Sequence, residues 1–169
     1  MEMFKMKVAV QDVDAIVAEV FSMFEEVAQN RDMDYILSSE LKGEALPVDR
    51  MFLEMMLTNL LSNAFKFTPD GGTVDFTIRE VSREENRGTY EFAVRDTGVG
   101  MSPEFMKRMF EPFAQEHDGG RGESRGSGLG LSIAHQLAEL MGGGIRAVSE
   151  EGKGTEMTLW LPFEISETM

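Results

Sequence analysis

The sequence predicts an α+β two-layer sandwich, in which a mixed sheet of about five strands is covered on one face by about three helices. Several segments alternate apolar and polar residues with the period of a half-buried strand. Longer segments repeat apolar residues at helical spacing, and the two kinds of segment do not alternate strictly along the chain.

The first part of the chain predicts a strand, a helix and a second strand. Apolar residues at every second position predict a half-buried strand over residues 4–10. Asp12 is expected to cap a helix over residues 13–27, where valine, isoleucine and phenylalanine recur at helical spacing. A short strand is predicted at residues 35–37.

The middle of the chain predicts a long helix followed by two strands. Residues 47–49 are typical of a turn, and Asp49 is the expected N-cap of a helix that runs to about Phe65. Alternation then predicts two strands joined by a polar hairpin loop, with the first strand at 74–78, the loop at 83–88 and the second strand at 90–94.

The last part of the chain predicts two helices and two closing strands. Ser102-Pro103-Glu104 combines a capping hydroxyl, a proline and an acid, which predicts a helix from there to about Phe110. Residues 114–127 are rich in glycine and charged side chains, which is typical of a long, mobile loop or lid. Helical periodicity returns over 127–141, and two strands are predicted at 145–149 and 155–162.

Composition and charge limit the classes of function. With 169 residues the chain suits one domain over 1–169, and no apolar run is long enough to cross a bilayer. Thirty acidic residues against sixteen basic ones give a formal net charge of −14, which argues against a nucleic acid partner. This acidity is typical of a solvated surface. The lack of cysteine excludes thiolate metal sites and a disulfide framework.

A polar stripe marks the predicted long helix. Asn59, Asn63 and Lys66 lie at i, i+4 and i+7, so they share one helix face. Two amides and an ammonium suit a metal-bound triphosphate, and the carboxamide oxygen of Asn63 is a suitable ligand for Mg²⁺. The alternative for this stripe alone is a solvent-facing side of an amphipathic helix.

A second motif, Asp96-Thr97-Gly98-Val99-Gly100, follows a predicted strand. An ionised carboxylate accepts hydrogen bonds, so Asp96 suits an exocyclic amine such as that of adenine. Gly98 and Gly100 permit tight turns and close approach of a ligand. The alternative is an ordinary strand-ending turn.

Two further glycine motifs follow. Residues 126–131, Gly-Ser-Gly-Leu-Gly-Leu, open a predicted helix, whose free N–H groups form an anion site; the alternative is a flexible hinge. This motif lacks both the surroundings of a dinucleotide fingerprint and the ending of a P-loop. Residues 152–155, Gly-Lys-Gly-Thr, taken alone predict a hairpin turn between two strands.

In this order, the motifs resemble those of the ATP-binding catalytic domain of sensor histidine kinases. Residues 59–68 are similar to the N box of that family. Residues 110–113, Phe-Glu-Pro-Phe, are similar to its F box, and the glycine motifs at 96–100, 126–131 and 152–155 to its three glycine boxes. The wider family includes DNA gyrase, mismatch-repair MutL and heat-shock chaperones.

The resemblance implies ATP and Mg²⁺ as cofactors and a role for each motif. Asn63 coordinates Mg²⁺ with Asn59 beside the same phosphates, Asn59 and Lys66 form the catalytic pair, and Asp96 reads adenine with support from Thr155. Phe110 and Phe113 anchor the base of the lid, and Arg121 and Arg125 reach the γ-phosphate or are merely solvated. The nucleotide-binding set is Asn59, Asn63, Lys66, Phe67, Asp96, Gly98, Gly100, Phe110, Phe113, Arg125, Gly126, Ser127, Gly128, Leu129, Gly130 and Thr155.

One position separates the branches of this family. Gyrase-like relatives place a water-activating glutamate where this chain has Asn59, which cannot act as a base. An imidazole acceptor is largely neutral at pH 7 and has less need of a base. The pocket is therefore expected to favour transfer to histidine over hydrolysis.

The expected acceptor lies elsewhere. Neither His117 nor His135 has the sequence context of a phosphoacceptor histidine. The chain is therefore interpreted as an excised catalytic domain, monomeric and cytoplasmic, that does not autophosphorylate alone. Its expected partners are a dimerisation and phosphoacceptor domain of the same parent protein and a response regulator receiver domain.

Three other functions stay open at this point. One is a pseudokinase or regulatory module that binds nucleotide without transfer. Another is a gyrase- or chaperone-type ATPase fragment, which Asn59 disfavours. The last is an anti-sigma-type serine kinase of the same fold, which a phosphoserine product would reveal.

Overall fold

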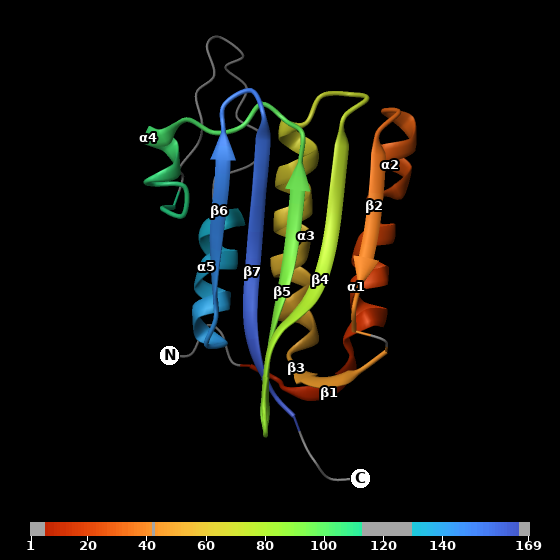
Figure 1. Ribbon diagram of the computed structural model, residues 1–169, viewed down its shortest axis with the longest axis vertical. Coiled ribbons are helices and arrows are strands. Elements are labelled where there is room, and N and C mark those ends of the chain that lie inside the picture. The colour runs from red at the N-terminus through yellow and green to blue at the C-terminus, as the bar shows by residue number, and fades with distance from the viewer. Residues whose placement is uncertain (1–5, 42, 113–129, 166–169) are drawn as a thin grey trace.

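A five-stranded mixed sheet forms one layer, and helices α1, α3 and α5 form the second layer against one of its faces (Figure 1). The computed structural model describes residues 6–41, 43–112 and 130–165. The elements are β1 (Ala9–Asp12), α1 (Val13–Ser22), α2 (Glu25–Asn30), β2 (Asp34–Ser39), β3 (Ala45–Val48), α3 (Arg50–Phe67), β4 (Thr73–Glu84), β5 (Arg87–Asp96), α4 (Pro103–Met106), α5 (Gly130–Leu140), β6 (Gly144–Glu150) and β7 (Gly154–Glu164). The predicted α+β sandwich is confirmed.

The strand order of the sheet is β2-β4-β5-β7-β6. Strand β2 runs parallel to β4, and each of the other neighbouring pairs is antiparallel. Strands β1 and β3 form a separate two-stranded sheet at one end of the molecule (Figure 1). The long antiparallel strands bring the ends of β5 and β7 together, and this shared end carries the site described below.

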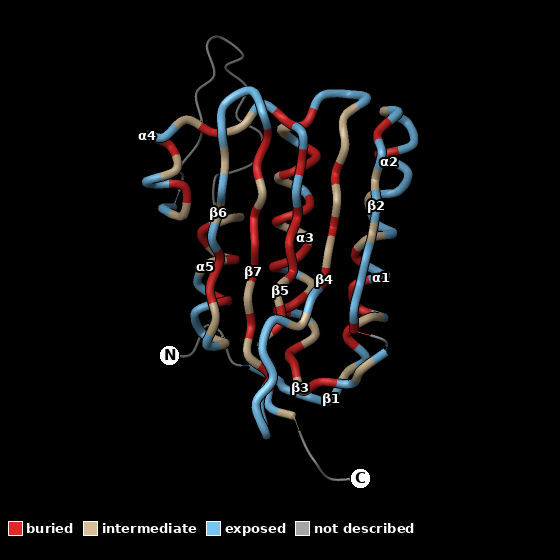
Figure 2. Tube along the Cα trace, viewed as in Figure 1, coloured by how far each residue is buried: buried red, intermediate tan, exposed pale blue. Residues whose placement is uncertain are grey.

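The core lies between the sheet and the helical layer (Figure 2). Alternate side chains of β4, β5 and β7 are buried because one face of each strand points at the helices. Helix α3 is central and buries eight side chains, which are Phe52, Leu53, Met56, Leu57, Leu60, Leu61, Ala64 and Phe65. The polar side chains of α3 lie outside this buried stripe.

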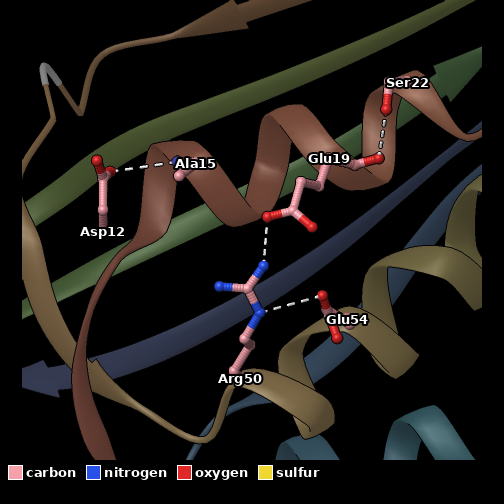
Figure 3. A network of polar contacts seen from close by, with 6 residues as sticks. All are labelled: Asp12, Ala15, Glu19, Ser22, Arg50 and Glu54. Carbon is pink, nitrogen blue, oxygen red and sulfur yellow. Dashed lines mark hydrogen bonds and ion pairs between the residues drawn. The ribbon is translucent and has the colours of Figure 1, made fainter.

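The predicted helix caps are confirmed. Asp12 accepts a hydrogen bond from the Ala15 N–H at 3.2 Å, and Asp49 accepts one from the Phe52 N–H at 2.9 Å. Between α1 and α3, Arg50 pairs with Glu19 and lies 3.3 Å from Glu54 (Figure 3). These ion pairs are largely exposed and contribute little to stability.

The strand predicted over 4–10 begins outside the described residues, and for residues 6–10 the prediction is wrong in extent and in burial. Strand β1 begins at Ala9, and the side chains of Val8 and Val10 are 55% and 71% exposed. The turn predicted at 47–49 is also wrong, because β3 includes Pro47 and pairs with β1. A two-stranded ribbon has free edges, so it accepts a proline that a central strand would exclude.

The helix predicted over 13–27 is two helices, and other boundaries shift. Helix α1 ends at Ser22, α2 begins at Glu25, and Val27 is 41% exposed. The break lets Phe24 stack on Phe65 of α3, with ring centroids 5.3 Å apart. Helix α3 runs two residues beyond the predicted end, α4 ends before Phe110, and the predicted hairpin loop is shorter because β4 and β5 extend into it.

In the described part of the chain, every helix is too short or too polar to span a membrane.

Candidate functional site

A row of four side chains crosses one end of the sheet. Val74 of β4 pairs with Asp96 of β5, Asp96 pairs with Thr155 of β7, and Thr155 pairs with Ser149 of β6. Paired residues project to the same face, and this face is the one covered by the helices. Asp96 and Thr155 are only 7% and 8% exposed, so two polar side chains end an otherwise apolar layer.

The two carboxylate oxygens of Asp96 differ in their hydrogen bonds. Its Oδ1 accepts hydrogen bonds from the N–H groups of Gly98 at 2.8 Å and Thr155 at 3.2 Å. Its Oδ2 accepts none from the residues that the structure describes. Burial raises the pKa of the Asp96 carboxyl above its ordinary value, and the two N–H donors oppose that rise. These two bonds hold the carboxylate in place, with Oδ2 as its remaining acceptor.

Thr155 is held by Ser149, a residue that the sequence analysis missed. The Ser149 Oγ lies 2.7 Å from the Thr155 Oγ1 and 3.1 Å from the Gly154 carbonyl oxygen. It also accepts a hydrogen bond from the Met101 N–H at 2.8 Å. A serine in a strand carries no motif, so only the strand register reveals this contact.

The glycine motif after β5 packs against the end of α3. A Cβ at Gly98 would lie 2.4 Å from the Phe67 carbonyl oxygen, so only glycine fits without a shift of the backbone. The Val99 N–H donates to that same oxygen at 3.1 Å, and the Val99 carbonyl accepts from the Gly152 N–H at 2.7 Å. Gly100 has a φ of +76° beside the β6–β7 turn. Three predicted motifs thus meet here.

Helix α3 adds the predicted polar stripe. Asn59 and Asn63 are half-buried, Lys66 is exposed, and Phe67 is half-buried at the end of the helix. Gly130, the first residue of α5, lies so close that a Cβ there would be 3.1 Å from the Asn59 Oδ1. The start of α5 therefore lies against Asn59 of the amide stripe.

Arg31 is a second residue that the sequence analysis missed. Its guanidinium donates to the Phe65 carbonyl at 2.8 Å and to the Thr68 carbonyl, and it pairs with Asp70 at 2.7 Å. A cation at the C-terminal end of a helix is stabilising because the last carbonyls have no partner within the helix. Arg31 thereby holds the end of α3 that carries Lys66.

Of the two predicted lid anchors, Phe110 lies in the described part of the chain. Phe110 stacks on His135 of α5, with ring centroids 4.5 Å apart and planes 17° apart. Several predicted positions lie outside the described residues, as does the loop predicted at 114–127. They are Phe113, His117, Arg121, Arg125, Gly126, Ser127, Gly128 and Leu129.

The donor set limits the metal chemistry of the site. The described residues contain no group of three or more His, Asp or Glu side chains that could hold a metal ion. The amide oxygens of Asn59 and Asn63 fit a cation such as Mg²⁺, which takes few protein ligands and keeps water and phosphate oxygens.

Comparison with known proteins places the chain in a family. Residues 48–165 match the sequence model of the family "Histidine kinase-, DNA gyrase B-, and HSP90-like ATPase". The match covers more than half of the 169 residues, and the chain belongs to this family.

Within the family, the similarity is to sensor histidine kinases. Histidine kinase P4 of Formosa agariphila is 34% identical over 163 residues, which cover 94% of this chain and 12% of that protein. The structure of full-length ShkA in complex with AMPPNP has a TM-score of 0.81 and 27% identity, and the similarity covers 99% of this chain and 33% of that one. The catalytic domain of histidine kinase ThkA has a TM-score of 0.79 at 23% identity, which shows the fold alone, over 93% of this chain and 96% of that one.

The resemblance to the catalytic ATP-binding domain of sensor histidine kinases is confirmed by these matches. The chain spans 12% of the length of histidine kinase P4. It spans 17% of the autoinducer 2 sensor kinase/phosphatase LuxQ of Vibrio parahaemolyticus and 9% of the hybrid signal transduction histidine kinase D of Dictyostelium discoideum. It therefore corresponds to a small part of these proteins.

Proposed function

We propose that this chain binds Mg-ATP at the shared end of β5, β7 and α3, and donates the γ-phosphate to a histidine of a separate dimerisation and phosphoacceptor domain. The observation that carries the proposal is the buried Asp96, whose Oδ2 accepts no hydrogen bond from the described residues, at the point where the turn after β5 packs against the end of α3. Family membership supports ATP as the ligand, and similarity to histidine kinases supports histidine as the proposed acceptor.

Each part of the pocket has a proposed role. Asp96 Oδ2 accepts a hydrogen bond from the adenine amino group, and Thr155 lies beside that contact. Phe67 lies against the nucleotide, and Lys66 offsets the charge of the phosphates. Asn63 and Asn59 hold the cation, which neutralises charge on the transferred phosphoryl group. Gly130 lets α5 approach the phosphates.

The transfer itself needs little covalent chemistry from the protein. A ring nitrogen of the acceptor histidine attacks the γ-phosphorus, the bond to the β-phosphate oxygen breaks, and ADP leaves. The chain contributes position and charge neutralisation, which dominate phosphoryl transfer. The glycine-rich loop at 114–127 is proposed as the ATP lid.

The proposed setting is two-component signalling in the cytoplasm, where ATP is available. A response regulator receiver domain takes the phosphoryl group from the histidine in this proposal. Residues 1–169 form one catalytic domain, which is proposed to be monomeric when isolated.

The first prediction tests metal-dependent transfer. Asn63→Ala should weaken Mg²⁺-dependent binding of an ATP analogue and slow phosphorylation of a supplied acceptor domain, each by at least about tenfold, because a ligand to the ion is lost. Calorimetry with Mg²⁺ and with EDTA, and phosphohistidine formation on the acceptor domain, measure the two effects.

Ser62→Ala is the matched control, because Ser62 is an exposed neighbour of Asn63 on α3. It should leave both quantities unchanged. Tight binding without any transfer would instead favour the pseudokinase, and a phosphoserine product would favour the serine kinase. Normal transfer by Asn63→Ala would remove Asn63 from the metal site.

The second prediction concerns Asn59. Asn59→Glu should raise the ratio of ATP hydrolysis to transfer by at least about tenfold, because a carboxylate at this position is able to act as a general base toward water. ADP release and phosphohistidine formation are measured on the same samples. Asn59→Gln is the control, since glutamine has the same length as glutamate but no carboxylate to act as a base. An unchanged ratio in Asn59→Glu would show that Asn59 does not set the choice of acceptor.

A further inference from the structure

We propose that Ser149 is a positioning residue that fixes the Thr155 hydroxyl as a hydrogen-bond acceptor, and thereby sharpens the preference of the pocket for adenine over guanine. The inference rests on the proposed nucleotide site and deepens it. In this proposal Ser149 acts without contacting the nucleotide. It acts through the row that joins β6, β7 and β5.

The three contacts of Ser149 determine where its single proton goes. The Met101 N–H donates to its Oγ at 2.8 Å, which occupies one lone pair. The Gly154 carbonyl oxygen, 3.1 Å away, is an acceptor only, so the Ser149 O–H must donate to it for this contact to be favourable. The remaining lone pair of Ser149 faces the Thr155 Oγ1 at 2.7 Å.

It follows that Thr155 donates its proton to Ser149. The opposite arrangement, with Ser149 donating to Thr155, would leave the Ser149 Oγ and the Gly154 oxygen in contact without a proton between them. That arrangement is disfavoured because two oxygen atoms would then oppose each other through their lone pairs. With its proton directed at Ser149, the Thr155 hydroxyl has only lone pairs left for other partners.

Two acceptors then lie side by side at the end of the sheet. The Thr155 N–H donates to Asp96 Oδ1, so the two residues are held together, and Asp96 Oδ2 of the carboxylate is an acceptor as well. The adenine amino group brings two hydrogens, whereas guanine presents a carbonyl oxygen at the same ring position. Two fixed acceptors favour the amino group and repel the carbonyl, which is how a polar site discriminates.

The experiment measures the ratio of dissociation constants for non-hydrolysable GTP and ATP analogues by calorimetry. Wild type is expected to prefer the ATP analogue. Ser149→Ala should reduce that preference by about three- to tenfold, which corresponds to the loss of one neutral hydrogen bond. Ser149→Thr keeps the hydroxyl and should restore most of the preference. Val148→Ala, at an exposed neighbour that points to the other face of β6, should leave the ratio unchanged.

A double-mutant cycle with Thr155→Val separates positioning from general loosening of the fold. If Ser149 acts through Thr155, the double variant should discriminate no worse than Thr155→Val alone. Additive losses, or equal weakening of both nucleotides by Ser149→Ala, would overturn the inference. Failure of wild type to bind either nucleotide would instead overturn the proposed function.

Discussion

Asp96→Asn is expected to weaken binding of an ATP analogue by at least about tenfold, because a hydrogen bond to a charged acceptor is replaced by an amide. The asparagine oxygen is able to keep the bonds from Gly98 and Thr155, which Oδ1 accepts now. Its NH₂ group then replaces Oδ2, and a donor faces the adenine amino group instead of an acceptor.

The same substitution is expected to stabilise the unliganded protein at neutral pH. Burial raises the pKa of Asp96, so the folded state binds its proton more tightly than the unfolded state does. The charged carboxylate therefore destabilises the fold fully above the folded-state pKa, and this penalty is gone below the unfolded-state pKa. The neutral asparagine side chain carries no such penalty, so the melting temperature at pH 7 should rise and its dependence on acid pH should weaken.

Thermal unfolding from pH 4 to 8 and calorimetry at pH 7 measure the two effects of Asp96→Asn. Asp75→Asn is the matched control, since Asp75 lies on the neighbouring strand β4 and points to the other face of the sheet. It should leave ATP binding unchanged. Loss of both binding and stability in Asp96→Asn would mean that the carboxylate supports the fold and is not held for a ligand.

Gly154→Ala is expected to destabilise the protein by about 3 kcal/mol or more, which would lower the melting temperature by roughly 6 °C or more. Gly154 has a φ of +110°, where side chains are strained, and a Cβ there would lie 2.0 Å from the Asp96 carbonyl oxygen. The clashing atoms belong to the backbone of β5 and of Thr97, so they are unable to rotate away. A backbone shift that relieved this clash would move the start of β7 and, with it, Thr155.

Gly152→Ala separates the two causes in this prediction. Gly152 has a comparable φ of +82°, yet a Cβ there would meet no atom within 4 Å. It should therefore show only the backbone strain, about 1 to 2 kcal/mol. Chemical denaturation of both variants measures the difference. Equal losses of stability in the two variants would show that contact with Asp96 contributes nothing.

Features that depend on neighbouring residues in the chain could be predicted without the structure. The helix caps Asp12 and Asp49 bond to N–H groups three residues away, and the alternation in β4, β5 and β7 reports a face buried on one side. The stripe of Asn59, Asn63 and Lys66 follows from helical period alone. The order of the glycine motifs was enough to identify the family, because the motifs and their order are visible directly in the sequence.

Contacts between residues that are distant in the chain could not be predicted from the local sequence pattern. Ser149 and Arg31 belong to no sequence motif. Ser149 lies 6 residues from Thr155 in the chain, and Arg31 lies 34 residues from Phe65. Strand register made the first contact, and packing of Phe24 and Arg31, which flank α2, against the end of α3 made the second. The apolar and polar period of a segment predicts neither its register in a sheet nor its packing partner.

The fold class, the central helix and the family therefore followed from side-chain chemistry and spacing along the chain. Only the tertiary structure determined that β1 and β3 form a separate two-stranded sheet and that α1 and α2 are separate helices. It also decided that Asp96 is buried with its pKa raised. These outcomes depend on which surfaces meet, because burial and hydrogen bonding between distant segments outweigh the weak preferences of each segment alone.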